Sequence, residues 1–303
     1  MAFALLLGLA AAFGWGTTDI TGAIAARRVG SLRVQVGALG ASTIAICVFA
    51  LLRPDLLGAE PLGGIWLGGL IGAFASIAYI AYLTALRLGP LAVVSPVVST
   101  YGGVTVLLAV FIRGEHVLPL QAVGALMAVS GVALTSVVVE PGAEAGTRGR
   151  ARLVGPGVIL AGVGSLVFGS LGVLLADPIA TYGPVPTLIG GRLGNALAGI
   201  VLLFVSVASR SNRLRPLLEP NGPLDRRILI LMIASGLADL VAFAAFSVGV
   251  EIGPVWAVGL ASSFGPLLVV LYAIGSVGER LRPVQWTGLA LIILGVILIV
   301  VTG

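Results

Sequence analysis

Charged residues are scarce in this sequence: they make up 10% of its 303 residues, and lysine is absent, so that every basic residue is an arginine. A water-soluble domain usually carries about 25% charged residues. Apolar residues make up 58% of the chain, and its mean hydropathy is +1.15. One soluble core cannot bury this excess, and a disordered chain would need low hydrophobicity instead. The composition therefore argues against a soluble enzyme and a disordered protein, and it indicates a protein of the lipid bilayer.

Histidine and cysteine each occur only once. Cys47 lies inside an apolar run, so that no disulfide framework can form. His116 stands beside Glu115 in a loop, and no HExxH or GxSxG motif accompanies it. An enzyme or a metal site would need more such residues, and we therefore expect no catalysis, no metal and no cofactor. The net charge of +5 does not indicate nucleic acid binding, because the arginines stand in short gaps between apolar runs.

Cutting the sequence at proline, glycine and charge clusters gives ten apolar runs, each close to the roughly 20 residues that a membrane-spanning helix needs. The runs are 3–25, 32–52, 62–85, 90–112, 119–139, 154–176, 184–208, 228–248, 254–276 and 283–302. They are continuous, whereas the strands of a membrane β-barrel would alternate apolar and polar residues. The sequence therefore predicts an all-α integral membrane protein of ten transmembrane helices.

A polar, glycine-rich loop at 140–153 divides the chain into two halves, 1–139 and 154–303, that repeat each other. A shift of 164 residues aligns them without a gap over about 60 positions. This shift places Gly89-Pro90 on Gly253-Pro254, Ser99 on Ser263, Gly114-Glu115 on Gly278-Glu279, and Gln121 on Gln285. Each half contains five runs, an odd number, so that the second half enters the membrane from the opposite side. We therefore predict two five-helix inverted repeats, which are typical of secondary transporters with a substrate site near the membrane midplane.

Several short motifs resemble those of a known family. They are Gly14-Trp15-Gly16, the paired segments Gly114-Glu115-His116 and Gly278-Glu279-Arg280-Leu281, and the Pro-x-Gln-x-x-Gly runs at 119–124 and 283–288. With them, each half resembles an EamA domain, and nearly the whole chain resembles ten-helix carriers of the drug/metabolite transporter superfamily. The resemblance implies a proton- or exchange-coupled carrier, often an exporter, with a central cavity for cargo such as amino acids, drugs, sugars or nucleotide derivatives.

The repeat and the resemblance together lead to one expected function. We expect a secondary-active transporter in the inner membrane of a bacterium that exports a small metabolite, an amino acid or a drug by alternating access. A flippase for a lipid-linked substrate, built on the same fold, is the main alternative. A channel, which the lack of symmetry in the charged residues disfavours, and a structural membrane protein are further alternatives.

Three ionisable residues lie within the predicted spans, where a charge costs about 2.5–3.5 kcal/mol at the bilayer centre and usually marks a functional site. Asp239 lies at the middle of its span, where it could carry a coupling proton or pair with a cationic group. A static ion pair between Asp239 and Arg192 is the alternative, and Arg192 could also bind an anionic group of the substrate. Trp15 and Asp19, four residues apart, could hold a cation together, unless Asp19 lies near the interface and Trp15 only packs.

Aromatic residues recur at positions that the repeat relates. Phe243 and Phe246 follow Asp239 on the same helical face, and the shift of 164 matches them to Tyr79 and Tyr82. The fourth and ninth runs add the candidates Ser95, Ser99, Trp256 and Ser263. Each of these two runs contains a proline, which frees backbone carbonyls that must line a cavity or find partners. Small hydroxyl residues also serve ordinary helix packing.

The arginines are distributed unevenly between the predicted loops. Loops after odd-numbered spans contain fourteen of them, whereas loops after even-numbered spans contain only Arg53 and Arg113. The positive-inside rule then places the odd loops in the cytoplasm and both termini outside, although the family resemblance implies cytoplasmic termini. The runs 119–139 and 283–302 are almost wholly apolar, so we expect them to face lipid or a second copy in a homodimer. The expected partners are thus the bilayer, a small-molecule substrate and a second copy.

Overall fold

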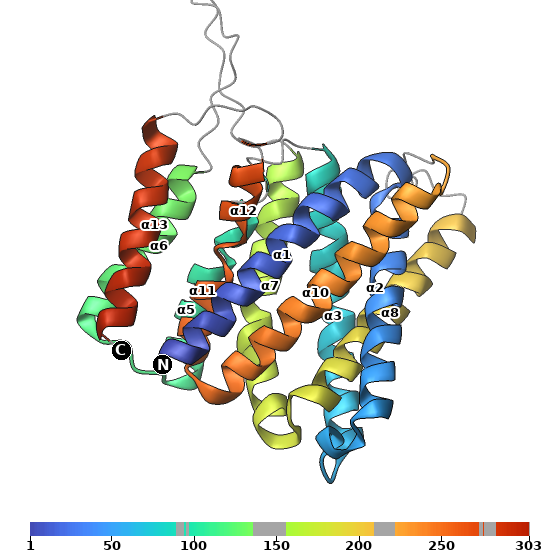
Figure 1. Ribbon diagram of the computed structural model, residues 1–303, viewed down its shortest axis with the longest axis horizontal. Helices are drawn as coiled ribbons and strands as arrows, with labels where there is room; N and C mark the ends of the chain where they lie inside the picture. The colour runs from blue at the N-terminus through green and yellow to red at the C-terminus, as the bar shows by residue number, and fades with distance from the viewer. Residues whose placement is uncertain are drawn as a thin grey trace, which may run out of the picture.

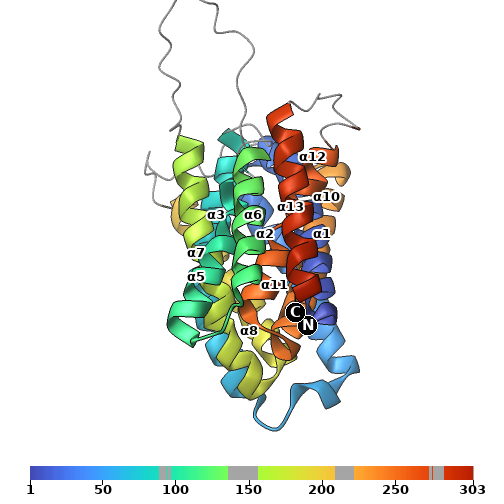
Figure 2. The same ribbon diagram turned by 90° about the vertical axis from the view of Figure 1, so that its left-hand side faces the viewer.

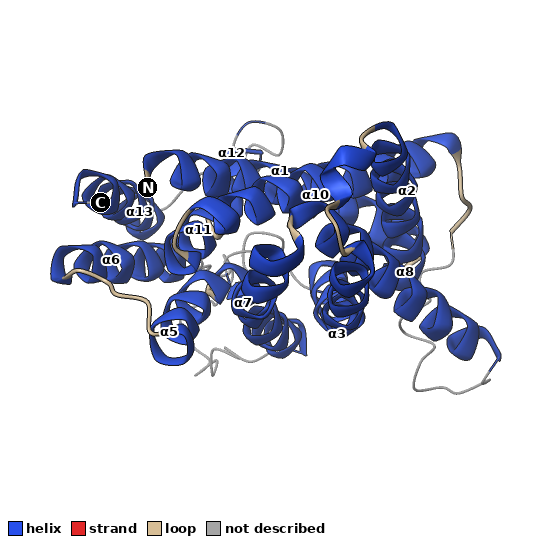
Figure 3. Cartoon of the chain, turned by 90° about the horizontal axis from the view of Figure 1, so that it is seen from below, coloured by secondary structure: helices blue, strands red, loops and turns tan. Residues whose placement is uncertain are grey.

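The computed structural model describes residues 1–88, 94, 97–135, 156–208, 222–272, 275 and 283–302. Its elements are α1 (Ala2–Val29), α2 (Ser31–Leu52), the 3-10 helix η1 (Pro54–Leu57), α3 (Pro61–Leu88), α5 (Tyr101–Arg113), α6 (Pro119–Thr135), α7 (Pro156–Tyr182), α8 (Pro184–Ala208), α10 (Arg226–Ile252), α11 (Val255–Ser262), α12 (Gly265–Tyr272) and α13 (Pro283–Thr302). Among these residues only helices and loops occur (Figure 3). The predicted all-α fold class is confirmed.

Six of these helices are long and apolar enough to cross a bilayer, namely α1, α2, α3, α7, α8 and α10. Four shorter apolar helices occupy the other predicted spans, over Val97–Arg113, Pro119–Gly131, Val255–Val269 and Trp286–Ile299. Large apolar side chains cover the outer surface; Phe13, for example, is 65% exposed. A soluble monomer rarely carries contiguous apolar surface on this scale. The described helices therefore indicate a multi-pass membrane protein, and the count of ten spans stays a prediction.

The predicted span 254–276 is not one continuous helix. It is interrupted by a turn at Ser263 and Phe264, which separates α11 from α12. In the first half, α5 begins directly after a turn at Thr100, and the shift of 164 matches Thr100 to Phe264. A hydroxyl group caps each of these turns. Ser263 Oγ donates to Leu260 O and Thr100 Oγ1 donates to Val97 O, both at 2.7 Å. Both halves thus interrupt the same helix at the same position.

The closest helix pairs join the first half to the second. Helix α1 packs against α10, α3 packs against α7 and α8, and α6 packs against α13. The pairing is reciprocal, because α1 on α10 corresponds by chain order to α7 on α3. Figures 1 and 2 show α6 and α13 side by side at one end of the molecule, with both chain termini near the same edge. Exposed apolar residues such as Leu126 of α6 and Val301 of α13 fit lipid or a second copy, and the homodimer stays a prediction.

The first two helices of each half also correspond, at a different shift. Helices α1 and α2 meet at Gly30, and α7 and α8 meet at Gly183, 153 residues later. Both glycines have positive φ angles, 90° and 86°, which a residue with a Cβ atom rarely adopts. The same shift of 153 matches Trp15 of α1 to Phe168 of α7. This second correspondence extends the repeat to helices whose sequences match only weakly.

Helices α3 and α8 cross in backbone contact because glycine lies on both sides of the crossing. The glycines are Gly68 and Gly72 of α3 and Gly190 and Gly194 of α8. A Cβ atom on any of them would clash with backbone atoms of the opposite helix. Such close approach of small residues is a common way to join helices in membranes. Because Arg192 lies between two of these glycines, the crossing also fixes the position of its side chain.

Candidate functional site

A cavity of about 750 Å³ lies between the two halves, with walls from both of them. The lining includes Trp15, Thr18, Asp19, Tyr79, Tyr82, Leu86, Ser99, Tyr101, Phe168, Phe243, Phe246 and Ser262. Seven of its sixteen lining residues are aromatic, and Asp19, which is 8% exposed, contributes a carboxyl group to the wall. We call this space the aromatic cavity.

Two equivalent groups of three rings form the wall of the aromatic cavity. Trp15 of α1 contacts Phe243 and Phe246 of α10, with ring centroids 5.2 and 5.6 Å apart. In the other half, Phe168 of α7 contacts Tyr79 and Tyr82 of α3, at 5.4 and 6.0 Å. Most of these contacts are edge-to-face, an arrangement that aromatic pairs favour. Phe168 was not among the residues predicted from the sequence; its match to Trp15 at a shift of 153 is the signal that could have identified it.

Tyr101 joins the two groups of rings. Its ring centroid lies 6.2 Å from that of Trp15 and 6.4 Å from that of Phe168. Its hydroxyl group lies 3.0 Å from Ser262 Oγ, just before the turn between α11 and α12. Tyr101 begins α5, so the helix interruption in the first half contacts the one in the second half. The two turns thus meet at the wall of the cavity.

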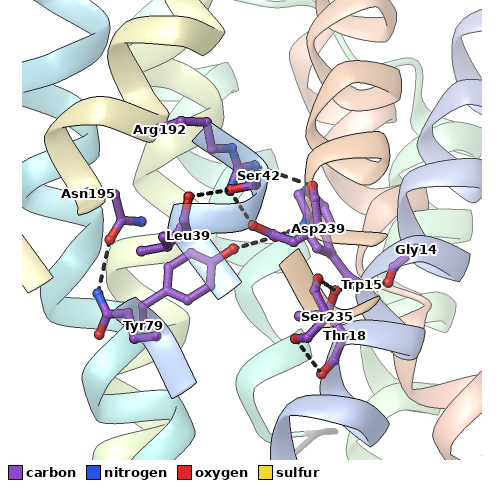
Figure 4. A network of polar contacts seen from close by, with 11 residues as sticks. Gly14, Trp15, Thr18, Leu39, Ser42, Tyr79, Arg192, Asn195, Ser235 and Asp239 are labelled. Carbon is purple, nitrogen blue, oxygen red and sulfur yellow. Dashed lines mark hydrogen bonds and ion pairs between the residues drawn. The ribbon is translucent and has the colours of Figure 1, made fainter. Parts of the chain in front are cut away.

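The carboxylate of Asp239 is the centre of a buried polar network that joins four helices (Figure 4). Trp15 Nε1 on α1 donates to Asp239 Oδ1 at 3.0 Å, and Tyr79 Oη on α3 donates to the same oxygen. Arg192 Nη1 on α8 donates to Asp239 Oδ2, forming an ion pair, and Nη2 lies 3.3 Å from the Asp239 carbonyl oxygen. Both charged groups are only 2–3% exposed. A buried pair of this kind is tolerable only because its hydrogen bonds are satisfied.

A second cavity of about 400 Å³ adjoins the aromatic one, and we call it the polar cavity. Thr187, Arg192 and Asn195 of α8 and Ser247 of α10 contribute its polar side chains. Behind it, Gln35 Nε2 of α2 donates to Asn195 Oδ1 at 3.0 Å. The two cavities therefore differ in chemistry: the first has aromatic rings from both halves, and the second has four hydrogen-bonding side chains among mainly apolar walls.

The other candidates from the sequence lie in several places. Ser99 lines the aromatic cavity, as do both aromatic pairs that were predicted. Ser95 lies outside the described residues. Trp256 is 1% exposed and packs in the apolar core, and Ser263 is buried at the turn after α11. The indole N–H of Trp15 is directed at Asp239 of α10 and not at Asp19 of its own helix.

Glu115 connects the two halves at the end of the molecule that also carries the termini. It follows α5, and its carboxylate accepts hydrogen bonds from the backbone N–H groups of Val255 and Trp256, at 3.2 and 3.1 Å. These are the first two residues of α11 in the other half. The first N–H groups of a helix lack partners within the helix, and a carboxylate there also complements the helix dipole. Glu115, which the sequence placed in a loop, thus caps a helix of the opposite half.

Replacing Glu115 by alanine is expected to lower the free energy of unfolding by about 0.5–2 kcal/mol, because α11 loses its cap. Thermal unfolding of the detergent-purified protein measures this change. Glu251→Ala is the matched control, since Glu251 is an exposed acidic residue at the last turn of α10. A surface change of that kind is expected to stay within about 0.5 kcal/mol. Equal losses in the two variants would show that the cap does not stabilise the protein.

Comparisons with known proteins agree with this architecture. The EamA-like transporter family matches the chain at residues 2–137 and again at 155–301, which is nearly its whole length. A solved crystal structure shares the fold, with a TM-score of 0.73 and 22% sequence identity over 100% of this chain and 98% of that one. No curated protein matches the chain. The resemblance drawn from the motifs is confirmed: the chain belongs to the EamA-like transporter family.

Proposed function

We propose that this protein is a secondary-active carrier of the inner membrane that moves a small molecule by alternating access, and that the aromatic cavity is its substrate site. The observation that carries the proposal is the position of this cavity between the two halves, with equivalent rings from each on its walls. A site shared by two related halves can open to either side when one half moves against the other. A channel would not need such an aromatic chamber.

The arrangement of the helices supports inverted repeats. In Figure 1, α1 begins at the lower edge and rises, whereas its counterpart α7 begins at the upper edge and descends. The reciprocal contacts of α1 with α10 and of α7 with α3 are those that a twofold axis in the membrane plane would generate. The paired interruptions before α5 and α12 are also typical of such carriers, in which broken helices meet near the midplane.

The charges at the two ends support an export direction. Arg27, Arg28 and Arg87 lie at one end, where the lining of the aromatic cavity also reaches Leu86. At the other end Arg53 pairs with Asp55 at 2.6 Å, and its hydrogen bond lowers the pKa of that carboxyl group. The positive-inside rule assigns the first end to the cytoplasm. A cavity that extends toward the cytoplasm suits a carrier that collects its cargo there.

The chemistry of the aromatic cavity suits a cargo with an apolar or aromatic body and a positively charged group. Rings can stack on the body, and ring faces attract a cation by about 0.5–2 kcal/mol each. Asp19 provides a carboxyl group on the same wall. The guanidinium of Arg192 is bound to Asp239 and lines the other cavity. This combination favours an amine or a cationic drug over an anionic metabolite.

Thermal stabilisation of the detergent-purified protein tests this proposal against a panel of amines, cationic drugs, amino acids, nucleotides and sugars. A ligand at about 100 times its dissociation constant stabilises a protein by about 2.7 kcal/mol. We expect cations to raise the melting temperature and Asp19→Asn to abolish that rise. Asp55→Asn is the control, because Asp55 is an exposed carboxylate far from the cavity.

The outcomes separate the alternatives. Cations that stabilise the protein and the Asp19→Asn variant equally would contradict the role of this carboxyl group. Stabilisation by anions alone, lost in Arg192→Gln, would assign the site to an anionic metabolite. No stabilisation across the panel would favour a flippase for a lipid-linked cargo. Uptake into proteoliposomes of whichever compound stabilises the protein then tests transport itself.

A further inference from the structure

The aromatic cavity and the polar cavity share part of their walls. Phe243 of α10 and Leu171 of α7 line both spaces. The remaining walls are distinct: Trp15 and Tyr79 line only the aromatic cavity, and Arg192 lines only the polar one. A molecule that passed from one cavity to the other would therefore have to pass these two apolar side chains.

The ring of Phe243 is held by one residue from each cavity. On the polar side, the guanidinium carbon of Arg192 lies 4.4 Å from the centre of the ring, which is a cation–π contact. On the aromatic side, the ring of Trp15 meets it edge-to-face at 5.2 Å. Both of these neighbours also bind the carboxylate of Asp239. Any rearrangement of that carboxylate would therefore move both groups that hold the ring.

We propose that Phe243, together with Leu171, is the gate between two successive stations of one transport path. This inference rests on the proposed function and adds to it a second station, the polar cavity. There the hydroxyl group of Thr187 and the amide group of Asn195 take the polar end of a cargo. The aromatic cavity holds the apolar body of the same cargo. Phe243 is a positioning residue, which keeps the two stations separate until the Asp239 network rearranges.

A single cysteine reporter in the polar cavity tests the gate without any knowledge of the cargo. The chain contains one cysteine, so that Cys47→Ser gives a cysteine-free background. Thr187→Cys then places a thiol in the polar cavity, within the first turn of α8. A membrane-impermeant, charged methanethiosulfonate reagent is added to right-side-out or to inside-out vesicles, and initial labelling rates are compared between the two. Their ratio reports from which side the polar cavity is reached.

We expect labelling of the reporter to be strongly one-sided when Phe243 is present, and this sidedness to be lost in Phe243→Ala. Phe246→Ala is the matched control, because Phe246 contacts the same Trp15 but lines only the aromatic cavity; it should stay one-sided. If the alanine variant does not fold, Phe243→Val replaces it. This variant removes the ring but keeps an apolar side chain, and it should also lose one-sided labelling. Folded Phe243 variants that label as one-sidedly as Phe246→Ala would overturn the gate.

The two proposals fail in distinguishable ways. The reporter needs no cargo, so that loss of sidedness in Phe243→Ala supports the gate even if the panel of compounds gives no binding. Conversely, binding and transport of a cation with unchanged sidedness in the Phe243 variants would retain the carrier and reject the gate. A reporter that labels equally from both sides in the presence of Phe243 would also reject it, because the two cavities would then already be continuous.

Discussion

Arg192→Gln is expected to lower the free energy of unfolding by about 3–5 kcal/mol. The substitution leaves the buried carboxyl group of Asp239 without its cationic partner, which is among the costliest single changes in a protein interior. Trp15 and Tyr79 would still donate to Oδ1, but Oδ2 would lose its partner. Thermal unfolding in detergent measures the loss. Because Arg192 also contacts Phe243, the order of the aromatic cavity wall should decrease as well.

The double variant Arg192→Gln/Asp239→Asn is the decisive control for this prediction. It removes both charges, so that no unpaired ion is left buried, and it should recover most of the stability lost in either single variant. A double-mutant cycle then yields the interaction between the two residues. Additive losses would mean that the pair contributes nothing beyond its separate members.

The same variants address proton coupling by Asp239, which stays a prediction: transport by Asp239→Asn with an unchanged pH dependence would contradict it.

Gly72→Ala is expected to destabilise the protein by about 1–3 kcal/mol, the usual range for overpacking a close contact. A Cβ atom at this position would clash with the carbonyl group of Gly191, and because that atom belongs to the backbone, α3 and α8 would have to separate. Arg192 follows Gly191 directly, so that the shift would also strain its ion pair with Asp239. Both thermal stability and ligand-induced stabilisation should therefore fall together.

Gly40→Ala provides the control for the glycine prediction. Gly40 also lies within a helix, α2, but no atom outside its own helix backbone lies within 4 Å of the position that a Cβ would take. Alanine is the better helix former by about 1 kcal/mol, so that this variant should be as stable as the natural protein or slightly more stable. A loss at Gly72 no greater than at Gly40 would show that the α3–α8 crossing can widen at no cost.

The helices and the membrane character could be predicted from the sequence, because apolar runs of about 20 residues between arginine-rich gaps have few other solutions. The interruption at Ser263 and Phe264 was not predicted, because the run from 254 to 276 is long enough for one span, although its serines and Pro266 are residue types that favour a turn. The correspondence of Trp15 with Phe168 was missed because the shift between the halves is not constant. The shift changes from 153 to 164 because the connection between the second and third helices is longer in the second half.

The candidate site could be predicted in part. A charge inside a membrane needs a partner, so that the pairing of Arg192 with Asp239 was one of the two readings that the sequence left open. The partner of Trp15 could not be predicted in the same way. Asp19 is near it on one helix, whereas Asp239 is 224 residues away along the chain and reaches it only because α1 packs against α10. The site roles of these residues stay predictions.

The two halves of this molecule differ in the residues that they place at its centre. The positions that correspond to Asp239 and Arg192 in the first half are Ala75 and Leu39, and the two tyrosines of one ring group face two phenylalanines in the other. In a carrier with two identical inverted halves, a twofold rotation would relate the inward and outward forms, which would then have equal energy. Here both buried charges, Arg192 and Asp239, belong to the second half, so that this equivalence is lost. In the proposed carrier, the preference of the empty protein for one form would thus depend on where these two buried charges lie.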